Sequence, residues 1–136
     1  MNAPFQLANA GKVLGIGCDL AEVARIRRAH ERHGQQFLDK VYAEQEQAYC
    51  LEQPNPYPCL AARFAAKEAI AKAFTTGIGE HLGWKSMTIV HGQRREPLVE
   101  LHGNARDLLR NLGGRNVHIS FTHTQETAMA FAILTD

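Results

Sequence analysis

The chain has 136 residues, of which 45% are hydrophobic and 21% are charged, and its net charge is +1. This length and composition predict a soluble globular protein that is large enough to bury a core. The near-neutral charge gives no reason to expect nucleic acid as a partner, and no apolar run is long enough to span a membrane. Residues 1–10 lack the basic and apolar blocks of a secretory signal.

Residues 1–11 are expected to form a loose N-terminal extension, and residues 12–136 are expected to form one domain. The three cysteines, Cys18, Cys50 and Cys59, have unrelated spacings and include no CxxC pair. An odd number of cysteines in such a pattern predicts reduced, mostly buried thiols in a cytoplasmic protein, rather than a disulfide or a zinc site.

The segment Val13–Leu20 alternates along its length, VLGIGCDL, which predicts a strand. One of its faces is apolar. The opposite face carries two glycines, which would let a neighbouring element pack closely against the strand. The apolar face consists of Leu14, Ile16, Cys18 and Leu20, and the other face consists of Val13, Gly15, Gly17 and Asp19.

Asp19, at the end of this strand, has two possible roles. Glu22 follows it by three residues, a box-like spacing that favours Asp19 as the N-cap of the next helix. A lone carboxylate beside a glycine-lined face is also a candidate metal ligand. The two roles need not exclude each other.

A helix is predicted over Ala21–His33, with Val23 and Ile26 facing inward and Gly34 ending it. Its basic side chains are either a solvated face or a docking site for an acidic partner, whose association they would accelerate. Three of them share one side at spacings of three and four: Arg25, Arg28 and Arg32.

One or two short helices are predicted over residues 37–53, with a break near Tyr42. The prolines of residues 54–58 then require an extended connector. The core candidates in the short helices are Phe37, Leu38, Val41, Tyr49 and Leu51.

Residues 63–74, RFAAKEAIAKAF, are rich in alanine and contain no glycine or proline, so they predict the middle of a long helix. The proline run 54–58 would precede its start, and Gly77 lies just past its end. Glu68 and Lys72 are four residues apart and therefore share a face. They form either an ordinary salt bridge or a carboxylate and lysine suited to a metal-bound phosphate.

The rest of the chain predicts antiparallel strands around one helix, which makes the protein α+β. The glycine-bearing loop at residues 75–79 is either a simple turn after the long helix or a place where a ligand lies along exposed backbone. The expected elements are strands at 84–90 and 98–102, a helix at 105–112, and a hairpin of 117–122 and 127–134 with its tip at 123–126.

Two stretches together resemble the hallmark motifs of the 4′-phosphopantetheinyl transferases: residues 15–26, GIGCDLAEVARI, and residues 63–74. Their order, their spacing and the chain length resemble the small bacterial holo-[acyl-carrier-protein] synthases. The stretches 77–79 and 118–124 are also similar to that subfamily. The resemblance implies an antiparallel sheet packed with one long central helix and shorter helices.

The resemblance also implies a reaction: Mg²⁺-dependent transfer of the 4′-phosphopantetheine arm of coenzyme A to a serine of an acidic apo-acyl carrier protein, with release of adenosine 3′,5′-bisphosphate. Asp19 and Glu68 are implied as Mg²⁺ ligands, and both, with Lys72, as catalytic residues. Two further sets are implied: Arg63, Lys72, Gly77, His123 and Thr124 for coenzyme A, and Arg25, Arg28 and Arg32 for the carrier protein. The family further implies a homotrimer with sites between subunits, and a role in fatty acid biosynthesis in the cytoplasm.

The chain departs from the family pattern at Thr75, where a glycine is usual, at Tyr42, where a capping threonine is common, and in the proline-rich loop 54–58, which is often basic. The last departure leaves open how the 3′-phosphate of coenzyme A is held. Two other functions are compatible with the residues alone: a small Mg²⁺-dependent nuclease or phosphohydrolase, and a non-catalytic module that binds acidic proteins.

Overall fold

The computed structural model describes residues 11–136. The predicted extension, residues 1–11, lies outside the described residues except for Gly11. The strands are β1 (Val13–Glu22), β2 (Met87–His91), β3 (Pro97–Leu101), β4 (Asn116–His123) and β5 (Thr127–Thr135). The helices are α1 (Val23–His33), α2 (Gln35–Val41), α3 (Glu44–Leu51), α4 (Tyr57–Ala73) and α5 (Asn104–Asn111), with one 3₁₀ turn at Trp84–Ser86.

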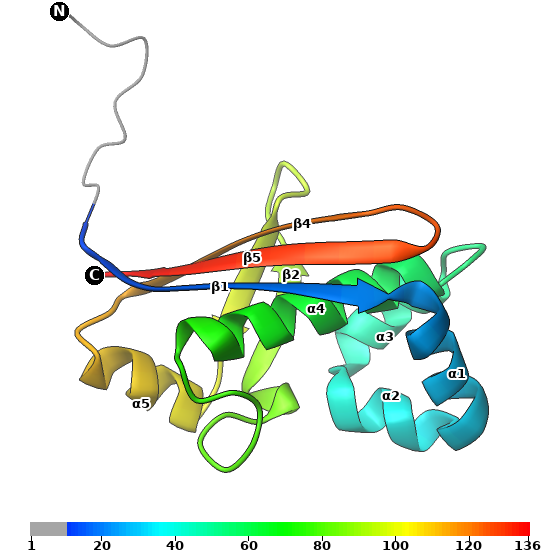
Figure 1. Ribbon diagram of the computed structural model, residues 1–136, viewed down its shortest axis with the longest axis horizontal. Coiled ribbons are helices and arrows are strands. Elements are labelled where there is room, and N and C mark those ends of the chain that lie inside the picture. Colours follow the sequence, from blue (N-terminus) through cyan, green and yellow to red (C-terminus); the bar gives the residue numbers. More distant parts are fainter. Residues whose placement is uncertain (1–10) are drawn as a thin grey trace, which may run out of the picture.

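The predicted α+β class is confirmed. Strands β1, β5 and β4 form an antiparallel sheet in that order, and β2 pairs with β3 in a separate antiparallel ribbon. The long helix α4 lies along one face of the three-stranded sheet, with α1, α2 and α3 gathered at one end and α5 at the other (Figure 1). No helix within residues 11–136 is long and apolar enough to cross a bilayer.

Helix α4 is the centre of the core. Its alanines are buried on nearly every side, because all three strands of the sheet, together with α1 and α3, pack against it. The helix begins at Tyr57, within the proline run that was predicted to precede it, and Pro58 stands in its first turn, where a missing N–H costs nothing. Thr75, just after its end, has a φ of 66°. That left-handed backbone suits glycine, the residue that the family resemblance implies there, and is unusual for a β-branched residue.

The glycine face of β1 packs directly on α4, as predicted. A Cβ at Gly17 would collide with the carbonyl oxygen of Ala69, and a Cβ at Gly15 would collide with that of Ala73. The backbones of strand and helix therefore lie closer than any side chain would allow.

Apart from Leu14, which is partly buried against the core, the apolar face of the same strand is exposed in residues 11–136. Ile16 is 67% exposed and Leu20 is 60% exposed. Cys18 pairs with Phe131 on β5, and Leu20 pairs with Met129, so these apolar side chains share one face of the sheet. We call the set Ile16, Cys18, Leu20, Met129 and Phe131 the outer apolar face.

Three local predictions were wrong. Asp19 does not cap α1: β1 continues to Glu22, which occupies the N-cap position and makes no side-chain cap bond. Asp19 is therefore free for other chemistry. Tyr49 and Leu51 are 44% and 45% exposed instead of lying in the core. Leu38 and Val41 are buried as predicted, and the break near Tyr42 is confirmed between α2 and α3.

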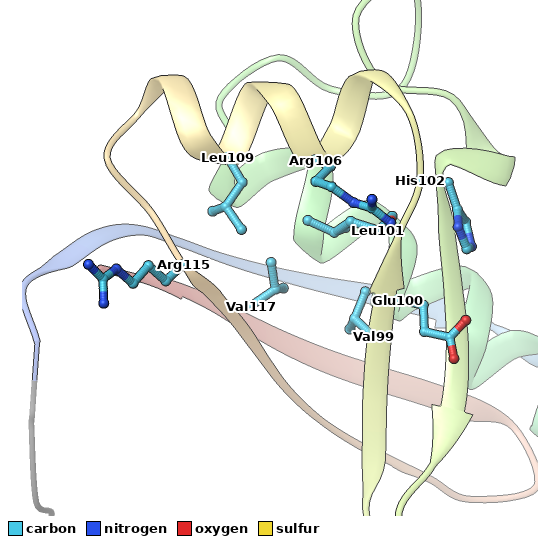
Figure 2. A pocket seen from close by; sticks show the side chains of 8 residues that line it. All are labelled: Val99, Glu100, Leu101, His102, Arg106, Leu109, Arg115 and Val117. Carbon is cyan, nitrogen blue, oxygen red and sulfur yellow. The ribbon is translucent and has the colours of Figure 1, made fainter.

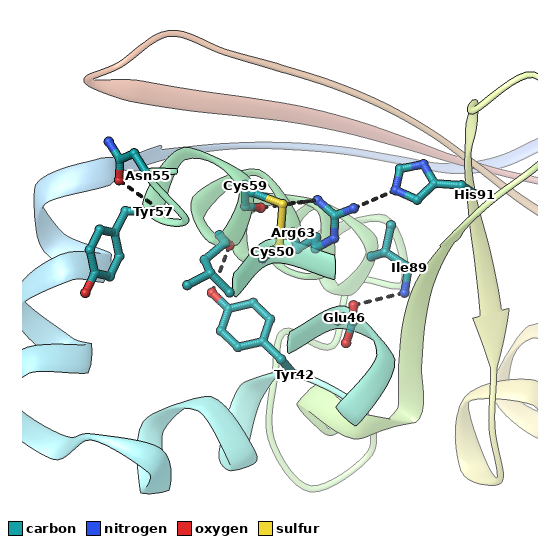
Figure 3. Close-up of a disulfide and its surroundings, with 10 residues drawn as sticks. Tyr42, Glu46, Cys50, Asn55, Tyr57, Cys59, Arg63, Ile89 and His91 are labelled. Carbon is teal, nitrogen blue, oxygen red and sulfur yellow. Dashed lines mark hydrogen bonds between the residues drawn. A yellow bond between two sulfur atoms is a disulfide. The ribbon is translucent and has the colours of Figure 1, made fainter. Parts of the chain in front are cut away.

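The cysteine prediction was also wrong. Cys50, near the end of α3, forms a disulfide with Cys59, in the first turns of α4 (Figure 3). Cys18 is exposed on the outer apolar face rather than buried. Spacing could not reveal the pair, because the proline-rich loop between the two helices decides whether the two sulfurs meet.

Replacing Gly17 by Ala should destabilise the protein, because its methyl group would force β1 away from α4. We expect a loss of about 1–3 kcal/mol in the free energy of unfolding, measured by urea denaturation. Gly79 is the matched control, since it lies in a loop where an added Cβ would meet nothing within 4 Å. Equal stability of Gly17→Ala and Gly79→Ala would show that β1 and α4 are not in such close contact.

Candidate functional site

The first group of candidate residues gathers where β1 passes over the C-terminal part of α4. Asp19 sits near the end of the strand, and Lys72 lies in the last turn of the helix. The Nζ of Lys72 donates to Oδ1 of Asp19 at 2.9 Å and to the carbonyl oxygen of Cys18 at 3.0 Å. Lys72 thus pairs with Asp19, and the salt bridge to Glu68, one of the two alternatives that the spacing left open, is not formed. The hydrogen bond to Asp19 raises the pKa of Lys72.

Glu68 lies in the same place, half-buried on α4 one turn before Lys72. Burial raises the pKa of the Glu68 carboxyl above its ordinary value, and the negative charge of Asp19 raises it further. The positive charges of Lys72 and Arg25 act in the opposite direction. Two carboxylates and two cations therefore lie within electrostatic reach of one another.

This donor set fits a magnesium ion. Mg²⁺ prefers oxygen ligands and is commonly held by one or two carboxylates, with phosphates and water completing its shell. Glu68 is half-buried and is repelled by Asp19, and both effects would be relieved by a cation between the two carboxylates. Within residues 11–136 no cluster of three or more His, Cys, Asp or Glu side chains exists. Asp19 and Glu68 would therefore need phosphate and water as the other ligands.

The predicted docking arginines run from this site along α1. Arg25 is the nearest of them: its charge acts on Glu68, and its guanidinium carbon lies 5.9 Å from the ring centre of Phe64. Phe64 in turn stacks on Trp84, with ring centres 4.7 Å apart. Arg28 and Arg32 are exposed further along the helix. The basic face of α1 therefore starts with Arg25, beside the carboxylate of Glu68.

The second group lies about one and a half turns before Glu68 on α4, around Arg63. This side chain is only 2% exposed, yet it lines a cavity of about 210 Å³. Its Nη1 donates to the carbonyl oxygen and the sulfur of Cys59, and its Nη2 lies 2.7 Å from Nε2 of His91 (Figure 3). Burial lowers the pKa of Arg63, although the guanidinium stays charged.

His123 lines the same cavity, so the structure brings Arg63 and His123 together as the resemblance implied. Thr124 and Gly77 are not among the lining residues. The hydroxyl of Thr124 accepts from the N–H groups of Glu126 and Thr127 and so serves the turn between β4 and β5. Gly77, with a φ of 67°, lies in the loop after α4.

Sequence reasoning missed several residues of this cavity: Tyr49, Gln53, Asn55, Pro58, Cys59, His91 and Phe121. Four of them, from Gln53 to Cys59, belong to the proline-rich connector and its flanks, which have no periodic pattern. The others come from α3, β2 and β4. No local sequence pattern could have predicted that these residues line one cavity, because they meet only after folding.

A different cavity, of about 360 Å³, opens between α5, β3 and β4 (Figure 2). None of the predicted site residues lines it. Its walls combine apolar and charged side chains: Val99, Glu100, Leu101, His102, Arg106, Leu109, Arg115 and Val117.

Comparison with known proteins agrees with this geometry. Residues 15–131 match the 4′-phosphopantetheinyl transferase superfamily. The chain is 46% identical to the holo-[acyl-carrier-protein] synthase of Chlamydia felis over 87% of this chain and 93% of that protein. It is 38% identical to the holo-[acyl-carrier-protein] synthase of Natranaerobius thermophilus over 90% of this chain and 97% of that protein.

Solved structures of this kind share the fold. The holo-[acyl-carrier-protein] synthase of Neisseria meningitidis superimposes with a TM-score of 0.85 at 30% identity, covering 92% of this chain and 100% of that chain. The Helicobacter pylori synthase, solved in complex with coenzyme A, gives a TM-score of 0.78 at 26% identity, covering 88% and 99%. The predicted fold is thereby confirmed. The chain therefore belongs to the holo-[acyl-carrier-protein] synthase family of 4′-phosphopantetheinyl transferases and is an enzyme of that class.

Proposed function

We propose that the chain transfers the 4′-phosphopantetheine arm of coenzyme A to a serine hydroxyl of an apo-acyl carrier protein, releasing adenosine 3′,5′-bisphosphate, with Mg²⁺ held by Asp19 and Glu68. The observation that carries this proposal is the convergence of Asp19, Glu68 and Lys72 across β1 and α4 in a chain of this family. The Helicobacter pylori and Bacillus anthracis synthases, both solved in complex with coenzyme A, support the choice of substrate.

The chemistry needs a base, a positive charge and a fixed geometry. The serine oxygen attacks the pantetheine-side phosphorus of the pyrophosphate, the bond from that phosphorus to the bridging oxygen breaks, and the bridging oxygen leaves on the adenosine bisphosphate. Glu68 accepts the serine proton, a role that its raised pKa favours. Lys72 places a fixed positive charge beside the leaving phosphate. When bound, the metal would neutralise charge on the pyrophosphate.

The cavity around Arg63 is the proposed place for the nucleotide end of coenzyme A. Arg63 and His123 supply positive charge or hydrogen-bond donors there, and the proline-rich loop contributes Asn55 and Pro58 to the wall. The 3′-phosphate would then be held by Arg63, since the loop itself carries no basic residue. Gly77 and Thr124 remain predicted contacts of coenzyme A.

The outer apolar face supports the proposed homotrimer. Contiguous apolar side chains at 40–67% exposure, as at Ile16 and Met129, mark an interaction surface.

The cavity at Arg63 lies nine residues before Lys72, which is about 14 Å along the axis of α4. We infer that each complete site combines residues of two subunits. A single domain over residues 12–136, a cytoplasmic location and a role in fatty acid biosynthesis belong to the same proposal.

The two other functions fit less well. A phosphohydrolase would act without a carrier protein, and a binding module would need neither Glu68 nor metal. Mass spectrometry after incubation with coenzyme A, Mg²⁺ and apo-acyl carrier protein separates the transferase from the two other functions. The proposal requires the carrier to gain the mass of the phosphopantetheine arm; an unmodified carrier would refute it.

Glu68→Gln should lower kcat by at least ~100-fold, because the variant lacks the proton acceptor. The measurement is the initial rate of carrier modification at saturating substrates and Mg²⁺. Glu44→Gln, an exposed glutamate in the first turn of α3, is the control and should retain full activity. Activity of Glu68→Gln within a few-fold of wild type would remove Glu68 from the mechanism.

The same variant should change how stability depends on pH and metal. The pKa of Glu68 is raised in the folded protein, so the folded state binds more protons than the unfolded state. The free energy of unfolding therefore falls as the pH rises from the pKa of the unfolded state to that of the folded state. Without Mg²⁺ at neutral pH, Glu68→Gln should therefore melt at the temperature of wild type or above it. Adding Mg²⁺ with coenzyme A should raise the Tm of wild type more than that of the variant. An equal gain in both would exclude Glu68 as a ligand.

Arg32→Ala should raise the apparent KM for acyl carrier protein roughly 3- to 10-fold at low salt and weaken its salt dependence, because exposed charges steer an acidic partner. Arg25→Ala should do the same and also lower kcat, since Arg25 acts on Glu68. Arg110→Ala, exposed on α5, is the control. A change confined to the KM for coenzyme A would refute the docking role.

Phe131→Glu should break the homotrimer, because a charge on the outer apolar face cannot be buried without a partner. Light scattering with size-exclusion chromatography should give three times the 15.1 kDa subunit mass for wild type and a smaller mass for the variant. Leu112→Glu, at a residue with similar exposure (45% against 47%), should keep the wild-type mass. A monomeric wild-type protein with full activity would refute the assembly.

A further inference from the structure

The side chain of His91 faces Arg63 from β2, and its two ring nitrogens have opposite hydrogen-bonding roles. A guanidinium can only donate, so Nε2 of His91 accepts the hydrogen bond from Nη2 of Arg63 at 2.7 Å. Nδ1 of His91 lies 3.2 Å from the carbonyl oxygen of Arg95, which can only accept. These two contacts assign the acceptor role to Nε2 of His91 and the donor role to Nδ1.

Tyr49 packs against both His91 and Arg63. The ring centre of His91 lies 4.6 Å from that of Tyr49, and the guanidinium carbon of Arg63 lies 4.7 Å from the same tyrosine ring. The carbonyl that accepts from Nδ1 belongs to Arg95, in the tight turn between β2 and β3, where its φ is 65°. A turn at the end of one ribbon thus determines which nitrogen of His91 faces the arginine.

The contacts of Arg63 leave part of its donor set for a ligand. Of its five N–H groups, two on Nη1 contact Cys59 and one on Nη2 contacts His91. Nε is buried and has no hydrogen-bond partner within residues 11–136. An orphaned buried N–H is costly unless a ligand satisfies it, and Arg63 lines the cavity in which a ligand would lie.

We propose that His91 is a positioning residue: by accepting through Nε2 it orients the Arg63 guanidinium so that the free donors receive a phosphate group of the nucleotide. This inference rests on the proposed function, because it takes the nucleotide end of coenzyme A as the occupant of the cavity. His91 need not touch the nucleotide, and it takes no part in phosphoryl transfer near Glu68. Its effect should be confined to nucleotide affinity.

The test uses the full chain and adenosine 3′,5′-bisphosphate as the probe, with the Kd measured by isothermal titration calorimetry. His91→Phe keeps a ring against Tyr49 but has no acceptor for Arg63, so the Kd should rise about 10-fold, the equivalent of one hydrogen bond to a charged group. His91→Gln restores an acceptor at the position of Nε2 and should stay within about 3-fold of wild type. His33→Phe, at an exposed residue ending α1, should leave the Kd unchanged.

Kinetics separate positioning from a general loss of structure. In His91→Phe the KM for coenzyme A should rise while kcat and the KM for carrier protein stay within about 2-fold of wild type. Should the phenylalanine variant fail to fold, His91→Leu is held to the same criteria.

The outcomes distinguish the inference from the proposed function. Wild-type affinity in His91→Phe, alongside weakened binding in Arg63→Ala, overturns the role of His91 and leaves the proposed function standing. Equal weakening in His91→Gln and His91→Phe also overturns it, because the acceptor would then not matter. A wild-type protein that neither binds the bisphosphate nor modifies a carrier refutes the proposed function, and the inference falls with it.

Discussion

The contact on which the rest depends is the approach of β1 to α4 through Gly15 and Gly17. Only residues without a Cβ let the strand lie against the carbonyl oxygens of Ala69 and Ala73. That approach carries Asp19, two residues further along the strand, to the last turn of the helix, where Lys72 reaches it at 2.9 Å. The convergence of charges is therefore a consequence of backbone packing.

A buried ion pair fixes the helix that supplies the other half of the site. Lys67 and Glu46 are fully buried and lie 2.7 Å apart. Lys67 also donates to the carbonyl oxygen of Val41, while Glu46 accepts from the N–H groups of Ala43 and Ile89. Burial lowers the pKa of Lys67, and the charge of Glu46 opposes that change. The pair is thus hydrogen-bonded on both sides, so the network ties α4 to α3 and β2 without leaving an unpaired buried charge.

The two candidate regions lie on one helix but are built differently. Glu68 and Lys72 are accessible and surrounded by charge, which suits a phosphate and a metal that come and go. Arg63 is buried between Tyr49, Phe121 and the disulfide, which suits a fixed donor in a cavity. The disulfide between Cys50 and Cys59 also restrains the proline-rich loop that forms part of the cavity wall. Arg63 is held rigidly because its part of α4 is enclosed by other elements. Glu68 and Lys72 are accessible because they lie further along the same helix.

The sequence by itself determined the elements and the candidate carboxylates, because strand alternation, alanine content and the spacing within each motif are local properties. The α+β class, the glycine face of β1 and the long helix were all predicted in this way, and the family resemblance added Arg63 and His123. Only the tertiary structure decided that Lys72 pairs with Asp19 instead of Glu68, that Cys50 meets Cys59, and that the apolar face of β1 is left exposed. These features, like the contact between His91 and Arg63, depend on residues far apart in the chain, and their meeting is set by how the elements pack rather than by any pattern within them.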